Sequence, residues 1–218
     1  MANTAVVYDR NVNGQELTFE ASGALLDASL VMRDRETDSW WSIMTSTSIG
    51  GSLDKTRLRE LPVGEKSTWK DWVGAHPDTL VLSIRGKEHT KNNPYDSYFQ
   101  SNDTFRDLVI EDTRLAPKES VFAFHLDDGA YAAAQESFEG GRLFGLGADR
   151  SVLLYREPGL SFFASSEAYL IEGSALAVDP SELLKRARAG GPGTSPLSGF
   201  DTFWYSWVAV NQNSALLE

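Results

Sequence analysis

Residues 68–82 read TWKDWVGAHPDTLVL, and residues 203–217 read FWYSWVAVNQNSALL. The two stretches align without a gap, and the alignment pairs both tryptophans and the valine that follows them: Trp69, Trp72 and Val73 with Trp204, Trp207 and Val208. A paired Trp-x-x-Trp-Val is rare by chance, and such a repeat affects every later assignment of the fold. We therefore expect a tandem duplication in which each copy ends in a short helix that carries the motif.

Composition limits the classes of partner. The chain has 218 residues, a formal net charge of −11 and 41% hydrophobic residues, which is enough apolar surface for a core. The negative charge repels phosphate backbones and anionic lipid, so we expect neither nucleic acid nor a membrane surface as partner. The chain has no cysteine, which excludes a disulfide or a thiolate metal site within it. No apolar run approaches the roughly 18 residues of a membrane-spanning helix.

Short apolar runs that alternate with polar turns predict a mainly β fold built from antiparallel units. Asn13-Gly14 is a strong hairpin signal between two such runs. The strands are expected at residues 4–8, 16–20, 25–32, 39–44, 79–84, 121–126, 131–134, 152–156 and 160–164. Helices are expected at residues 67–76, at 182–189 and at the second tryptophan motif, which Asp201 or Thr202 can cap.

The duplication suggests a division of the chain. We expect a first β-rich unit at residues 3–84, a connector at 85–119 and a second β-rich unit at 120–217, fused into one globular domain. The charged turn before Trp40-Trp41 resembles the one before Phe162-Phe163, which supports this division. The tryptophans of both helices are expected in the core, although exposed tryptophans could also form a binding platform. One member of Trp40-Trp41 should be partly exposed, because neighbours on a strand point to opposite faces.

Several motifs recur in order along the chain. They are Asn3-Thr4-Ala5-Val6-Val7-Tyr8-Asp9-Arg10, Leu30-Val31-Met32, Asp34-Arg35-Glu36-Thr37, Ser39-Trp40-Trp41-Ser42, Trp69-x-x-Trp72, His76-Pro77-Asp78-Thr79, Pro94-Tyr95-x-x-Tyr98 and Pro117-Lys118-Glu119. Together they resemble a family of bacterial and archaeal proteins known as domain of unknown function three-one-seven-nine. The resemblance covers essentially the whole chain, and it implies no activity.

The chain departs from the family pattern at two places. The family usually has a Cys-Pro-x-Cys segment immediately before the position of Asn3, which predicts that this chain is trimmed just after that segment. The resemblance also implies export from the cytoplasm, and a longer, cysteine-containing form could bind metal. The second repeat has Asn211-Gln212-Asn213-Ser214 in place of His-Pro-Asp-Thr, so a symmetric pair of identical sites is not expected.

His76 and Asp78 are the candidate catalytic residues. An imidazole and a carboxylate two residues apart can converge on one point for proton transfer or metal binding. The alternative is a helix-terminal histidine followed by a turn at Asp78-Thr79. The second repeat has lost both ionisable groups, which fits either a role kept by one copy or drift at exposed positions.

The other polar residues point to no further site. We interpret His125 as a hydrogen-bonded strand histidine and His89 as a solvated loop residue. The acidic run Asp34, Glu36 and Asp38 lacks the glycine and distal glutamate of a calcium loop, so a charged turn is favoured. The chain has no serine-nucleophile motif and no dinucleotide motif. We expect no cofactor and no metal site in this chain.

The connector is where a binding site is expected, because it has no counterpart in the repeat and loops on a rigid scaffold concentrate binding residues. We predict that Tyr95, Tyr98 and Lys118 lie near the cleft between the units, on the side of His76. The alternative is a surface loop whose tyrosines cover core edges. The leading interpretation of function is an exported β domain that binds an unknown small molecule or protein. The alternative is a hydrolase that uses His76 with a nearby carboxylate.

Overall fold

A computed structural model of the chain describes residues 2–83, 95–173 and 178–218, and it is mainly β, as expected. Its strands are β1 (Val7–Tyr8), β2 (Asn11–Val12), β3 (Gln15–Glu16), β4 (Phe19–Leu26), β5 (Ser29–Asp34), β6 (Trp40–Ser42), β7 (Thr47–Gly50), β8 (Glu60–Leu61), β9 (Ser120–Leu126), β10 (Gly129–Ala134), β11 (Arg142–Gly145), β12 (Arg150–Tyr155), β13 (Glu167–Glu172), β14 (Thr194–Pro196), β15 (Phe200–Phe203) and β16 (Ala215–Leu217). Its helices are α1 (Trp69–Ala75), α2 (Asp96–Gln100), α3 (Pro180–Arg188) and α4 (Trp204–Val208), with short 3-10 turns η1 (Phe105–Asp107) and η2 (Gln135–Phe138).

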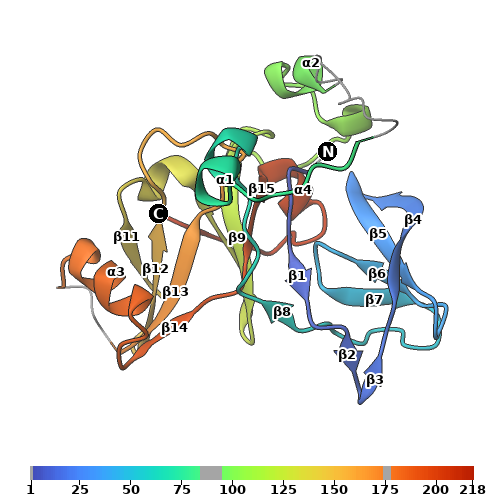
Figure 1. The fold of residues 1–218 in the computed structure, drawn as a ribbon, viewed down its shortest axis with the longest axis horizontal. Helices are drawn as coiled ribbons and strands as arrows, with labels where there is room; N and C mark the ends of the chain where they lie inside the picture. The colour runs from blue at the N-terminus through green and yellow to red at the C-terminus, as the bar shows by residue number, and fades with distance from the viewer. Residues whose placement is uncertain (1, 84–94, 174–177) are drawn as a thin grey trace.

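Three four-stranded sheets form the body of the molecule. The sheet β4-β5-β6-β7 lies on one side, the sheet β11-β12-β13-β14 with α3 lies on the other, and β9, β15 and α4 lie between them (Figure 1). The middle sheet has the order β15-β9-β10-β16, and its pairing of β10 with β16 is parallel, whereas the other strand pairs are antiparallel. The two-stranded sheet β1-β8 lies between the two sides.

The first half follows the predicted meander with one correction. Asn13-Gly14 forms the tight turn between β2 and β3, with φ of 53° and 83°, as its Asn-Gly sequence predicts. The single strand expected at residues 25–32 is wrong. The chain reverses there between β4 and β5, where Asp27 and Ala28 both have positive φ. The pattern of apolar residues does not reveal this turn, because the strands on both sides of it have a similar apolar content.

The second half contains a second correction. Residues 160–164, expected as a strand, form a turn, and the next strand is β13. Arg156 explains this difference. Its guanidinium donates to the carbonyls of Leu160, Ser161 and Ala164, so these acceptors are satisfied without a neighbouring strand. Phe162-Phe163 therefore does not occupy an element equivalent to Trp40-Trp41 in β6.

Buried side chains link the two halves. One cluster joins Met44 from the first half to Trp204 and Trp207 of α4. The start of the chain also lies against the second half, since Thr4 Oγ1 donates to Thr202 Oγ1 at 2.9 Å. The first half has a cluster of its own around Trp41, while Trp40 is 38% exposed, so the expected inside-and-outside pair is confirmed. The three-part division of the chain stays a prediction.

The two tryptophan motifs share one local geometry. Trp72 Nε1 donates to Thr79 Oγ1 at 3.0 Å, and Trp207 Nε1 donates to Ser214 Oγ at 2.7 Å, in each case seven residues further on. The amide of His76 donates to the carbonyl of Trp72 at 2.7 Å, and the amide of Asn211 donates to the carbonyl of Trp207 at 3.0 Å. Each helix therefore ends with the same backbone bond, four residues after its second tryptophan. The repeat therefore recurs as local structure. Duplication of the whole units is not confirmed, because the halves contain different sets of sheets.

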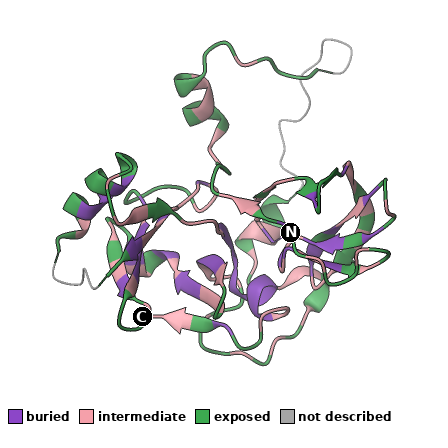
Figure 2. Ribbon diagram, turned by 90° about the horizontal axis from the view of Figure 1, so that it is seen from below, coloured by how far each residue is buried: buried purple, intermediate pink, exposed green. Residues whose placement is uncertain are grey.

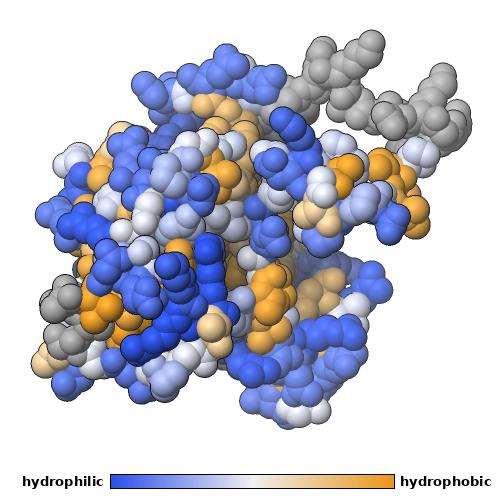
Figure 3. Space-filling view, turned by 60° about the vertical axis from the view of Figure 1, so that its left-hand side comes forward, coloured by the Kyte–Doolittle hydropathy of each residue, from blue (hydrophilic) through white to orange (hydrophobic). Residues whose placement is uncertain are grey.

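The burial of the two motifs differs, which corrects one expectation. Trp204 and Trp207 are fully buried, whereas Trp69 is 58% exposed and α1 contains no buried residue. Figure 2 shows α1 and the residues after it projecting away from the body, and Figure 3 shows hydrophobic side chains on this projection at the right-hand edge. Leu80 and Leu82 are almost fully exposed there. The strand expected at residues 79–84 is absent at the described residues 79–83.

Candidate functional site

A hollow of about 370 Å³ lies where the connector meets the second half. Its walls come from α2, the start of β9, η2 and the turn that follows Arg156. The volume is within the range of small-molecule sites, which are concave and combine apolar walls with a few polar groups. Lys118, one of the predicted ligand-binding residues, lines this hollow.

Lys118 connects the hollow to the predicted tyrosines. Its Nζ lies 3.6 Å from the centre of the Tyr98 ring and donates to the carbonyls of Tyr98 and Ser101. Tyr98 in turn shares a hydrogen bond of 2.7 Å with the hydroxyl of Tyr205 in α4. Burial lowers the pKa of the Lys118 ammonium, which the charge of Asp103 partly offsets. Lys118 and Tyr98 are therefore brought together, with the ammonium turned toward α2.

Three carboxylates line the same hollow: Glu119, Glu136 and Glu139. Glu119 is half-buried at the entry to β9, whereas the other two are exposed. Burial raises the pKa of the Glu119 carboxyl, and the charge of Glu136 raises it further. Both causes disfavour the ionised form, so an added positive charge beside Glu119 would be stabilising.

Arg156 is the second cation of the hollow, and only 2% of its surface is exposed. Its guanidinium is held by the carbonyls of the 160–164 turn and by a longer contact of 3.5 Å to Ser166 Oγ. Neither Arg156 nor Lys118 forms an ion pair with any carboxylate among the residues that the structure describes. The glutamates of the hollow are thus not neutralised by direct pairing.

Phenylalanine rings form the apolar part of the wall. Phe99, Phe162 and Phe203 all line the hollow, and their centroids lie 5.7 Å, 6.3 Å and 6.2 Å from one another. The faces and edges of such rings can contact an organic cation at close range. The hollow therefore combines an aromatic wall with a negative rim.

The candidate catalytic residues lie elsewhere. His76 is the C-cap of α1, where its ring lies 4.1 Å from the Trp72 ring, and His76 and Asp78 both line a shallow hollow on the projection. They share no hollow with Lys118. Tyr95 is 48% exposed at the N-cap of α2, and His89 and Pro94 lie outside the described residues. The structure brings Tyr98 and Lys118 together but does not bring His76 to them, and the ligand-binding role of Tyr95, Tyr98 and Lys118 stays a prediction.

His125 occupies a separate polar network between the halves. Its Nε2 shares a hydrogen bond of 3.1 Å with Asn211 Oδ1, and its Nδ1 lies 3.8 Å from Glu60. Burial alone would raise the pKa of Glu60, but contacts with His125 and Ser46 outweigh it and leave the pKa lowered. The carboxylate stands between the serine and the histidine here, so this is not the serine–histidine–carboxylate order of a nucleophilic triad.

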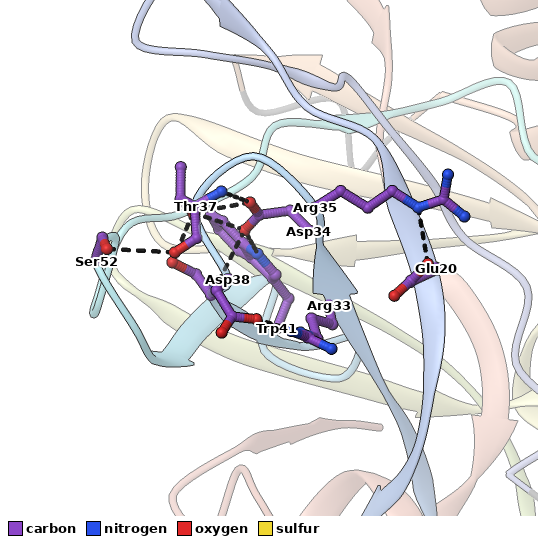
Figure 4. Close-up of polar contacts among 9 residues, drawn as sticks. Glu20, Arg33, Asp34, Arg35, Thr37, Asp38, Trp41 and Ser52 are labelled. Carbon is purple, nitrogen blue, oxygen red and sulfur yellow. Dashed lines mark hydrogen bonds and ion pairs between the residues drawn. The ribbon is translucent and has the colours of Figure 1, made fainter.

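The acidic run at residues 34–38 is a structural turn. Asp34 is fully buried, and its carboxylate accepts from Trp41 Nε1 at 2.8 Å, from the amide of Thr37 at 2.6 Å and from the amide of Ser39 at 3.2 Å (Figure 4). Arg33 pairs with Asp38 beside it. These donors occupy the carboxylate that a cation would need, which agrees with the expected charged turn.

Comparison with known proteins places the chain in a family. The family model described as "Protein of unknown function (DUF3179)" matches residues 1–214. The chain belongs to this family. No curated protein and no solved structure matches this DUF3179 chain. The resemblance inferred from its motifs is confirmed, and the function of the chain is not established by it.

No group of three or more metal-ligating His, Asp or Glu side chains occurs among the residues that the structure describes. Within the same residues, no helix combines the length and apolar composition that crossing a bilayer requires. Sequence reasoning missed Glu136, which belongs to no motif, and it included Arg156 only in the charged turn before Phe162-Phe163. It quoted Glu119 within Pro117-Lys118-Glu119 without assigning it a role.

Proposed function

We propose that the hollow beside α2 binds a small organic cation, an amine or quaternary ammonium compound. The observation that carries this proposal is the environment of Glu119. Its carboxyl is half-buried, and the charge of Glu136 acts on it, while neither cation of the hollow forms an ion pair with it. A ligand cation would relieve the repulsion between the glutamates.

The aromatic wall supports the same ligand class. Three phenylalanine rings about the hollow would contact the apolar part of the ligand, and their quadrupoles favour a positive charge over a neutral group of the same shape. A flat anionic ligand is disfavoured by the three glutamates. The proposal thus names a ligand class for the ligand-binding β domain that the sequence suggests. Export of the native protein is also part of the proposal, and it rests on the family resemblance alone.

Titration calorimetry with 2-phenylethylamine tests the proposal, and 2-phenylethanol serves as the neutral ligand of matched size. The amine is expected to bind the native chain at least about tenfold more tightly than the alcohol, which corresponds to about 1.4 kcal/mol. Glu119→Gln should remove most of this preference. Glu172→Gln is the matched control, because it removes the same charge at an exposed position away from the hollow.

The proposal fails if amine and alcohol bind alike, if neither binds, or if the preference survives in Glu119→Gln. The hydrolase alternative at His76 stays a prediction, and the position of His76 on the surface of the projection does not favour it. Metal binding by a longer, cysteine-containing form also stays a prediction. Metal analysis of that form, with and without its cysteines, tests it.

A further inference from the structure

A second and larger hollow, of about 630 Å³, lies between the two halves of the molecule. One wall is formed by β1 and residues 61–67, which lead into α1, and the other by residues 164–169 and 196–199. The face of the molecule in Figure 3 is hollowed near its centre, with hydrophobic side chains inside. Apolar side chains contribute much of the wall, among them Val6, Leu61, Phe122, Leu160 and Leu197. We call this hollow the interunit cleft.

Lys66 is the cation of the interunit cleft. Its Nζ donates to the carbonyl of Asn3 at 2.8 Å and makes a longer contact of 3.5 Å to the carbonyl of Asp201. Its backbone is fixed on the opposite wall, because the Lys66 amide donates to Ser165 Oγ at 2.6 Å and the Ser165 amide donates to the Lys66 carbonyl at 3.0 Å. The ammonium is therefore positioned by both walls without contacting a carboxylate among the described residues.

One buried carboxylate, Asp201, and one buried cation, Arg156, act on the charge of Lys66. Asp201 is 2% exposed, and its carboxylate accepts from Gln135 Nε2 and Ser166 Oγ, both at 2.6 Å, and from the Ser166 amide at 2.8 Å. All of these donors are neutral. The Asp201 carboxylate is thus bonded by neutral groups and forms no ion pair with Lys66 among the described residues. Burial lowers the pKa of the Lys66 ammonium, the charge of Asp201 opposes this, and that of Arg156 adds to it. A cation held away from water without a counter-charge is costly.

We propose that the interunit cleft binds an apolar monocarboxylate of the fatty-acid type, with its carboxylate on Lys66 and its chain along the apolar walls. A single carboxylate would pair with the Lys66 ammonium, which has no ion pair among the described residues, and the cleft volume suits a medium-length chain. The other carboxylates of the cleft do not serve this purpose. Glu167 is paired with Arg188 at 3.0 Å, the Asp71 carboxylate accepts from the hydroxyl of Thr68, and Glu65 is exposed to water.

Octanoate and 1-octanol test this inference, because they share a chain length and differ in charge. Octanoate should bind the native chain at least about tenfold more tightly than 1-octanol, and Lys66→Met should remove that difference. Lys66→Arg, which keeps the charge, should retain part of it. Lys70→Met is the control, since Lys70 is exposed in α1. Equal binding of acid and alcohol by the native chain, or undiminished octanoate binding by Lys66→Met, would overturn the inference.

A measurement on the native chain covers the case in which Lys66→Met does not fold. Acetylation of lysines, followed by mass spectrometry, should be slowed at Lys66 by octanoate and left unchanged at Lys70. Absence of protection at Lys66 contradicts the inference. The two proposed sites can fail independently, because octanoate binding should be unchanged in Glu119→Gln and 2-phenylethylamine binding unchanged in Lys66→Met.

Discussion

Lys118 lies with its Nζ 3.6 Å from the centre of the Tyr98 ring, and the same ammonium donates to the Ser101 carbonyl at 2.8 Å. Tyr98 belongs to α2, Ser101 caps that helix, and Lys118 leads into β9. This one side chain therefore fastens α2 to the segment that leads into β9.

Replacing Lys118 with methionine is expected to loosen α2. The change removes two hydrogen bonds from a cation and its contact with an aromatic ring, which together cost about 1–3 kcal/mol of the free energy of unfolding. Urea unfolding measures the loss, and hydrogen exchange should show it concentrated in residues 95–101. Lys70→Met is the control. Equal effects of the two variants would mean that Lys118 does not hold the connector.

Asp34→Asn is expected to destabilise the β5–β6 turn strongly. Asparagine would present an amide N–H₂ to groups that are themselves donors, and a buried unsatisfied group costs about 1–3 kcal/mol. Asp38→Asn, at an exposed site in the same turn, should cost less than about 1 kcal/mol. Thermal unfolding of both variants distinguishes them. A cost for Asp38→Asn equal to that of Asp34→Asn would contradict the role assigned to the buried carboxylate.

Asp34 also makes stability depend on pH. Burial would raise the pKa of its carboxyl, but the bonds from Trp41, Thr37 and Ser39 outweigh burial and lower the pKa below the ordinary value of 3.8. The carboxylate therefore contributes its full stability above the unfolded-state pKa, and this contribution is lost as the pH falls below about 4. Acid unfolding of Asp34→Asn should show a smaller dependence on pH in that range than the native chain shows.

The two tryptophan motifs should differ sharply in their effect on stability. Trp207→Ala removes a fully buried side chain and leaves Ser214 without its partner, which is expected to cost about 3–5 kcal/mol. Trp69→Ala changes an exposed residue and should cost less than about 1 kcal/mol. Urea unfolding measures both. A large loss in Trp69→Ala would show that α1 is docked in solution.

These motifs also show how far the sequence predicts the fold. The Trp-x-x-Trp-Val repeat predicts a short helix at both places, whereas the bond from the second tryptophan to Thr79 or Ser214 is seen only in the structure. It does not predict burial, because burial depends on what packs against the helix. α4 meets β9 and Met44, whereas α1 has no buried residue. Similarly, the strand expected at residues 160–164 is lost to a long-range contact of Arg156 that no local pattern contains.

The site was predictable only in part for the same reason. Lys118 and Tyr98 lie in one connector, so proximity in sequence predicts that they meet. Glu119 and Glu136 come together through the pairing of β9 with β10, which a single sequence does not specify. His76 was assigned a role from its spacing with Asp78 alone. His76 and Asp78 do lie in one hollow, but that hollow is on an exposed projection of the molecule.

Glu119 should make cation binding depend on pH. Burial and the charge of Glu136 raise the pKa of its carboxyl in the free protein, and a bound cation would lower it again. The affinity for 2-phenylethylamine should therefore increase as the pH rises across the acidic range in which carboxyl groups titrate, where the amine itself stays charged as lysine does. Calorimetric titrations at several pH values measure this trend. An affinity that falls or stays constant over the range would contradict it.

The most direct test of the central claim is the number of protons released when 2-phenylethylamine binds at acidic pH, measured by calorimetry in buffers of different ionisation enthalpy. Because the cation lowers the pKa of Glu119, the account predicts release of a fraction of one proton by the native chain and by Glu172→Gln, and no release by Glu119→Gln. Binding without proton release in the native chain, or equal release by Glu119→Gln, would contradict the claim that the cation sits on the Glu119 carboxylate.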